Sequence, residues 1–236
     1  MVSRVVFNPF TVVMLIILIG LFIIVLPLLF LSLIGSALVK LGFTYREVII
    51  LLFLTLVGSF INIPITTITG EPVTVREPAP SLFGMLYRVR EVTPVTQVAI
   101  NVGGALIPIF ISLYLLYESI TTLDPFIVPL ALVGVTVVSI FVKLVARPVR
   151  GVGIVTPFFI PPLAALASGL LLSTFTTEPI AAAIIAYVSG TLGTLIGADI
   201  ANLPRIRELV SPMVSIGGAG TFDGVFLTGI IAAFLA

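Results

Sequence analysis

Residues 10–38 of the chain read FTVVMLIILIGLFIIVLPLLFLSLIGSAL, an apolar run without a charged side chain. A helical crossing of the hydrocarbon core of a membrane needs about 20 such residues. The run is therefore long enough to span a bilayer, with length to spare for a tilt or for a kink at Pro27. It also exceeds the length of a signal peptide and lacks a small-residue cleavage site, so we interpret it as a retained span.

The rest of the chain has the same apolar character. Hydrophobic residues make up 59% of the 236 residues and charged residues only 9%, with a mean hydropathy of +1.34. This composition leaves too little polar surface to coat a water-soluble globule. We therefore predict one integral membrane domain over residues 1–236, a multi-pass protein of the cell membrane whose first partner is the lipid bilayer.

Composition also excludes several classes of function. The net charge is +1 and no basic cluster is present, which excludes nucleic acid as a partner. The chain contains no cysteine, histidine or tryptophan, so thiol, imidazole and zinc-histidine chemistry are excluded as well. The sequence predicts neither a metal site nor a cofactor.

The apolar runs predict an all-α fold, a polytopic bundle of transmembrane helices in which Gly, Pro and Asn break some of the spans. The motif Ile61-Asn62-Ile63-Pro64 should end or unwind the second helix. The polar stretch 70–95 is predicted to be a surface loop, with a short interfacial helix over 82–90. About seven spans are expected, near residues 10–38, 47–67, 96–117, 126–145, 158–175, 179–200 and 213–236.

The distribution of basic residues predicts the orientation of this bundle. With seven spans, every Lys and Arg except Lys40 and Arg46 falls on the side that holds the N-terminus. Cytoplasmic loops carry the excess of basic residues in membrane proteins. We therefore expect the N-terminus to be cytoplasmic and the C-terminus to lie outside.

Asp199 and Asp223 are the only acidic residues well inside apolar stretches. An ionisable group at membrane depth costs about 2.5–3.5 kcal/mol even on lenient scales, so such residues mark functional sites. A turn between the last two spans would bring both carboxylates to a similar depth. Two facing carboxylates in a medium of low dielectric share one proton, which is the condition for aspartyl hydrolysis. We predict both as catalytic residues.

A simpler explanation remains open for Asp199. This residue could cap the end of its own helix, or its carboxylate could pair with Arg205 or Arg207 at the membrane interface.

Small and polar residues gather at the predicted helix breaks. Two Gly pairs interrupt apolar spans, and such interruptions in two halves of a chain are typical of transporters built from repeats. Gly pairs equally allow neighbouring helices to approach closely, and the sequence leaves both readings open. The candidate substrate- or ion-binding residues are Asn62, Asn101, Gly103, Gly104, Asn202, Ser215, Gly217, Gly218, Gly220, Thr221 and Gly224.

Three functions are compatible with these features. The first is an intramembrane diaspartyl protease that hydrolyses transmembrane peptides. The alternative is a proton- or cation-coupled transporter of a small ion or solute that uses the same aspartates and the broken helices. The third is a scaffold or lipid-binding protein without catalysis. A small-residue face on the outside of the bundle would also support a homo-oligomer.

Four motifs together resemble an uncharacterised prokaryotic membrane family called domain of unknown function 1614. They are Ile61-Asn62-Ile63-Pro64, Asn101-Val102-Gly103-Gly104-Ala105-Leu106-Ile107-Pro108, Gly197-Ala198-Asp199 and Gly217-Gly218-Ala219-Gly220-Thr221-Phe222-Asp223-Gly224. This resemblance extends over most of the chain. It implies a membrane protein and no particular activity.

The C-terminal helix pair also resembles, more weakly, the catalytic helices of presenilin and signal peptide peptidase. In those proteases an aspartate ends one span, a basic loop follows, and a Gly-x-Gly-Asp motif opens the next span. Asp199 would match the first aspartate, Asp223 the second, and Gly220 the first glycine of the motif. Phe222 stands in place of the second glycine, and Ala198 stands where an aromatic residue is usual.

Overall fold

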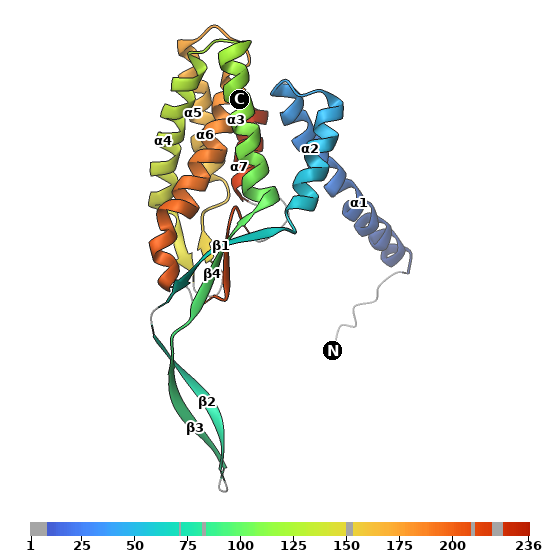
Figure 1. Cartoon of the computed structure of the whole chain (residues 1–236). Coiled ribbons are helices and arrows are strands. Elements are labelled where there is room, and N and C mark those ends of the chain that lie inside the picture. The colour runs from blue at the N-terminus through green and yellow to red at the C-terminus, as the bar shows by residue number, and fades with distance from the viewer. Residues whose placement is uncertain (1–8, 71, 82–83, 150–152, 209–210, 219–223) are drawn as a thin grey trace, which may run out of the picture.

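Helices account for most of the chain in this computed structural model, which describes residues 9–70, 72–81, 84–149, 153–208, 211–218 and 224–236. Figure 1 shows α3 to α7 packed side by side, with α1 inclined away from them. The α-helices of the described part are α1 (Pro9–Lys40), α2 (Tyr45–Gly58), α3 (Ile107–Thr121), α4 (Ile127–Val145), α5 (Ile160–Leu172), α6 (Ala181–Thr194) and α7 (Gly224–Leu235).

Four helical runs of the described part are long and apolar enough to cross a membrane: Val12–Lys40, Val102–Thr121, Ile127–Val145 and Ala181–Arg207. The prediction of about seven spans is therefore not confirmed: seven α-helices of the described part overlap the predicted ranges, but only four runs of that part are long enough to cross. Helix α7 has 12 residues. At about 1.5 Å per residue it reaches about 18 Å, short of the roughly 30 Å hydrocarbon core.

The chain is mostly helical, as predicted, but the all-α prediction needs correction because the ends of three predicted spans, 47–67, 96–117 and 213–236, are strands. Strands β1 (Asn62–Thr69), β4 (Val95–Asn101) and β7 (Met213–Ile216) form a sheet in the order β1-β4-β7. Strand β4 runs antiparallel to β1 and parallel to β7. Their Ile, Val and Thr residues are as apolar as a helical span but favour a strand through their β-branched side chains.

The stretch predicted as a surface loop with a short helix is instead a β-hairpin. Strands β2 (Val73–Ser81) and β3 (Gly84–Val92) pair antiparallel from Val73 opposite Val92 to Ser81 opposite Gly84. Figure 1 shows the hairpin projecting from the sheet, away from the helices. A second short hairpin, β5 (Arg147–Val149) with β6 (Gly153–Val155), joins α4 to α5.

Helix α6 lies at the centre of the bundle, and nearly all of its residues are buried. Glycines allow its neighbours to approach closely. A Cβ on Gly190 would lie 3.1 Å from the Cα of Gly229 in α7, and one on Gly193 would lie 2.8 Å from the Cβ of Val138 in α4. Small residues at helix contacts are how membrane bundles gain van der Waals packing without a hydrophobic driving force.

The two ends of the bundle are built from different elements. The sheet and the β5–β6 hairpin lie at one end, and the turns that join α1 to α2, α3 to α4 and α5 to α6 lie at the other (Figure 1). Arg147 belongs to the sheet end, whereas Lys40 lies at the opposite end, where its Nζ donates to the carbonyl of Phe234 at 3.1 Å.

Candidate functional site

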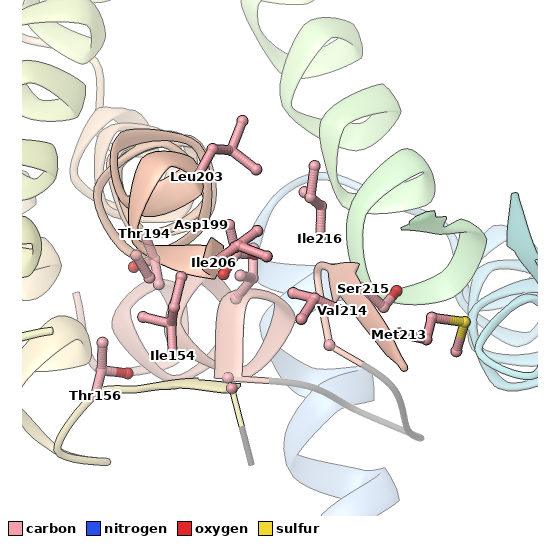
Figure 2. A pocket seen from close by; sticks show the side chains of 15 residues that line it. Ile154, Thr156, Thr194, Asp199, Leu203, Ile206, Met213, Val214, Ser215 and Ile216 are labelled. Atoms are coloured by element: carbon pink, nitrogen blue, oxygen red, sulfur yellow. The ribbon is translucent and has the colours of Figure 1, made fainter. Parts of the chain in front are cut away.

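A cavity of about 240 Å³ lies where the bundle meets the sheet. Its walls come from β6, from β7, from the first residues of α7 and from the helical run that continues α6 (Figure 2). Its polar side chains are Thr156, Thr194, Asp199 and Ser215, and its apolar ones include Ile154, Leu203, Ile206, Val214 and Ile216.

Asp199 sits at a break in the central helix. After Thr194 the helix widens into a π-helical turn, η3 (Leu195–Asp199), and then tightens into a 3₁₀ helix, η4 (Ile200–Glu208). Pro204 lies inside η4 and cannot donate to a regular helical ladder. Gly197 allows the wide turn to pass close to the Ser139 carbonyl, because a Cβ at this position would collide with that oxygen. π-Turns within α-helices are frequent at functional sites.

The side chain of Asn202 forms hydrogen bonds within this break. It is 1% exposed, and its Nδ2 donates to the carbonyls of Gly197 and Ala198, each at 2.9 Å. Its Oδ1 is buried without a hydrogen-bond partner among the described residues. Asn202 therefore replaces helical donors that the irregular turn removes, and it does not line the cavity.

The carboxylate of Asp199 joins this break to the second Gly pair, Gly217-Gly218. Its Oδ2 accepts the backbone N–H of Gly217 at 2.7 Å, and Asp199 is half-buried on the cavity wall. Gly217 and Gly218 have φ angles of +79° and +80°, a conformation that favours glycine. The sharp turn thus places an amide donor against the carboxylate, which orients the side chain at the cavity.

The second predicted catalytic residue, Asp223, lies outside the described residues, as do Gly220 and Thr221. Gly224, which follows Asp223 in the sequence, starts α7 and lines the cavity. The predicted meeting of the two carboxylates stays a prediction.

The polar residues of the sheet form a separate network. Asn101 is fully buried; its Nδ2 donates to the Ser59 carbonyl at 2.8 Å and to Asn62 Oδ1 at 3.1 Å. Its Oδ1 accepts the N–H of Gly104 at 2.7 Å. Ser215 Oγ donates to the same Asn62 Oδ1 at 2.6 Å. These bonds join β1, β4 and β7 to the end of α2 and to the short π-helix η1 (Val102–Leu106).

The first Gly pair, Gly103-Gly104, has a packing role. A Cβ on Gly103 would collide with the Thr55 carbonyl and the Ser59 amide, and one on Gly104 would collide with the Gly217 carbonyl. Close approach, one of the two readings of the Gly pairs, is therefore what the structure shows for this pair. Of the predicted site residues, Asp199, Ser215, Gly218 and Gly224 line the cavity, whereas Asn62, Asn101, Gly103, Gly104, Asn202 and Gly217 do not.

Two polar side chains of the cavity, those of Thr194 and Thr156, were not predicted. Thr194 lies inside an apolar run, where a threonine is expected to bond back to its own helix, and Thr156 follows a strand that hydropathy does not reveal. Only the π-turn and the β5–β6 hairpin place them beside Asp199, and no pattern in the sequence indicates either element.

The fold and cavity define a membrane protein with a polar site at a broken central helix. Within that class, the chain belongs to the family described as "Protein of unknown function (DUF1614)", whose family model matches residues 56–235. No curated protein and no solved structure matches the chain. The resemblance to presenilin and signal peptide peptidase is not confirmed by these comparisons.

Proposed function

We propose that this protein is an intramembrane aspartyl protease that hydrolyses membrane-embedded peptides, with Asp199 and Asp223 as its catalytic pair. The observation that carries the proposal is a half-buried carboxylate, Asp199, on the wall of a cavity that is bordered by the edge strand β7. Gly224, the residue after Asp223, also lines this cavity.

The edge of β7 supports a peptide as the ligand. Strand β7 is terminal in the order β1-β4-β7, and among the described residues no strand pairs with its outer side. Because Gln97 N–H donates to the Pro212 carbonyl at 3.0 Å, the alternation of a parallel ladder turns the N–H groups of Met213 and Ser215 outward. An extended peptide is recognised by such main-chain donors.

Strand β6 borders the cavity as well, since Gly153 and Ile154 line it. Its only partner among the described residues is β5. A peptide segment in the cavity would thus have strand backbone on two sides. A helical substrate must unwind before its peptide bond is accessible. Strand backbone on two sides would hold the unwound segment in an extended form, which supports hydrolysis as the function.

The chemistry follows from two carboxyl groups in different protonation states. Asp199, as the carboxylate, takes one proton from a water molecule whose oxygen bonds to the peptide carbonyl carbon. The protonated carboxyl of Asp223 gives its proton to the carbonyl oxygen. The C–N bond of the resulting diol then breaks, the nitrogen takes the proton from Asp199, and Asp223 regains its proton from the diol.

The proposed setting is the cell membrane, with the chain crossing it several times, the N-terminus cytoplasmic and the C-terminus outside. The basic residues at the sheet end, including Arg147, Arg205 and Arg207, support this orientation. The cavity would then lie near the cytoplasmic interface, where water for hydrolysis is available.

Cleavage of a helical transmembrane reporter by purified protein in liposomes tests the proposal. Asp199→Asn and Asp223→Asn should each lower the rate by about 10²- to 10⁴-fold, the usual contribution of a general acid or base. Asp124→Asn, which changes an acid far from the cavity, is the matched control and should cleave normally. Undiminished cleavage by either of the first two variants would refute the proposal.

A proton- or cation-coupled transporter is the second candidate. The observation that favours it is the break in the central helix around Asp199, where the buried Asn202 Oδ1 has no partner among the described residues. Broken helices with an acidic residue form ion sites in transporters. Proteoliposomes in which Na⁺ or pH gradients drive uptake, with uptake lost in Asp199→Asn and no reporter cleavage, would select this function over the protease.

A further inference from the structure

Thr194 lines the cavity and carries a buried hydroxyl group. The residue is 2% exposed, and its Oγ1 has no hydrogen-bond partner among the described residues. Thr194 also lines the cavity that contains Asp199. A buried hydroxyl without a partner is rare in folded proteins and calls for a physical reason.

Several hydroxyl groups of this bundle are satisfied by their own helices, whereas those of Thr55, Tyr187 and Thr191 share with Thr194 the lack of a partner among the described residues. Thr228 Oγ1 donates to the Gly224 carbonyl at 2.6 Å, and Ser112 and Ser119 donate to carbonyls four residues earlier at 2.9 and 2.7 Å. This bond to residue i−4 is the usual one for a helical hydroxyl in an apolar setting. Thr194 makes no such bond to Gly190, and among the described residues with an unpartnered buried hydroxyl it is the one that lines this cavity.

The π-turn explains why Thr194 and Asp199 share one wall. In a regular α-helix, a residue five positions further on lies about 140° round the axis, almost on the opposite side. The segment Leu195–Asp199 is π-helical, and bonding from i to i+5 brings residues five apart towards the same face. The irregular turn therefore serves to place a hydroxyl beside a carboxylate.

We propose that Thr194 Oγ1 and the Asp199 carboxylate bind one water molecule in this cavity. A threonine hydroxyl can donate to the water oxygen, while the water donates one of its protons to the carboxylate. A polar cavity with two such groups has the space and the partners that a buried water needs. In the proposed hydrolysis, this bound water is the nucleophile and Thr194 orients its oxygen. This role of the water rests on the proposed function, whereas the water site itself does not.

Cysteine labelling tests the water site without any need for enzymatic activity. The chain contains no cysteine, so a single Thr194→Cys substitution gives one reactive thiol. Thr191→Cys is the matched control: Thr191 is equally buried in α6 but packs against Gly229 and does not line the cavity. With methanethiosulfonate ethylammonium, the thiol at position 194 should react at least about tenfold faster, because labelling follows solvent access. Equal rates would show a dry cavity and overturn the proposal.

Reporter cleavage tests the orientation of the water. Thr194→Val keeps the shape but removes the hydroxyl, so kcat should fall at least about tenfold with KM little changed. Thr194→Ser should restore kcat, and Thr191→Val should leave both constants unchanged. A wild-type kcat in Thr194→Val would overturn the role of Thr194. If the wild-type protein cleaves no peptide, the protease proposal fails, and the labelling experiment still decides whether the water site exists.

Discussion

Two π-helical turns in this protein have opposite consequences. In the turn η1, the preceding Asn101 uses both its amide nitrogen and its oxygen in bonds to protein groups. At the turn η3, the Oγ1 of Thr194 has no partner among the described residues, and Asp199 lines a cavity. We call η1 the closed turn, because the side chain of Asn101 is fully bonded there, and η3 the open turn, because it borders the cavity. Satisfied polar groups therefore indicate architecture, and an unsatisfied hydroxyl beside a carboxylate indicates a ligand.

The largest effect on stability is expected at the closed turn, from Gly104→Ala. The added Cβ collides with the carbonyl of Gly217, whose N–H is bonded to Asp199, so the free energy of unfolding should fall by about 3 kcal/mol. Gly20→Ala is the control, since no atom lies within 4 Å of a Cβ there. The measurement is the unfolding free energy in detergent micelles. Equal stability of the two variants would mean that η1 tolerates movement and that the contrast between the turns is wrong.

Asn101→Ala should have the next largest effect. It leaves the Ser59 carbonyl and the Gly104 amide without the side chain that satisfies them, at a cost of about 2 kcal/mol. The same unfolding assay measures it. A change below about 0.5 kcal/mol, the range of ordinary surface substitutions, would show that this network does not hold the closed turn.

Acidification should have a smaller effect, through Asp124. The Thr176 hydroxyl and the Phe126 amide donate to its two oxygens and hold the pKa of Asp124 below its ordinary value. A lowered pKa in the folded state stabilises the protein fully above about pH 4, and this stabilisation is lost as pH falls through the lowered value. The melting temperature of the wild type should thus exceed that of Asp124→Asn at pH 6.

At the acid end of the titration, the difference in melting temperature between wild type and Asp124→Asn should shrink. A difference in melting temperature that stays constant from pH 6 to the acid end would contradict the lowered pKa of Asp124. Asp124 thereby provides an acid with purely architectural contacts against which the behaviour of Asp199 can be compared.

The smallest effect on stability is expected from Thr194→Val at the open turn. Among the described residues the hydroxyl has no partner to lose, so the unfolding free energy should change by less than about 0.5 kcal/mol. The unfolding assay used for Asn101→Ala checks this expectation. A loss as large as that of Asn101→Ala would mean that Thr194 is bonded within the protein, and the two turns would then be alike.

Much of the fold could be predicted because the hydropathy and length of a segment indicate whether it lies in lipid or in water. Each apolar run overlaps one α-helix of the described part, although three of the runs also include a strand. Asp199 stood out because an acid inside such a run is costly. The resemblance of four motifs to one membrane family was also confirmed.

The rest depended on contacts between distant segments. Residues such as Ile63 and Ile100 suit a span and a strand equally well, and only the pairing of β1, β4 and β7 decided between them. The role of Gly104 came from a carbonyl more than a hundred residues away in the chain. Local composition thus determined that the chain belongs in a membrane and which acid to examine. Tertiary packing alone decided where the central helix widens and which hydroxyl shares its cavity, because a π-turn depends on the neighbours that hold it open.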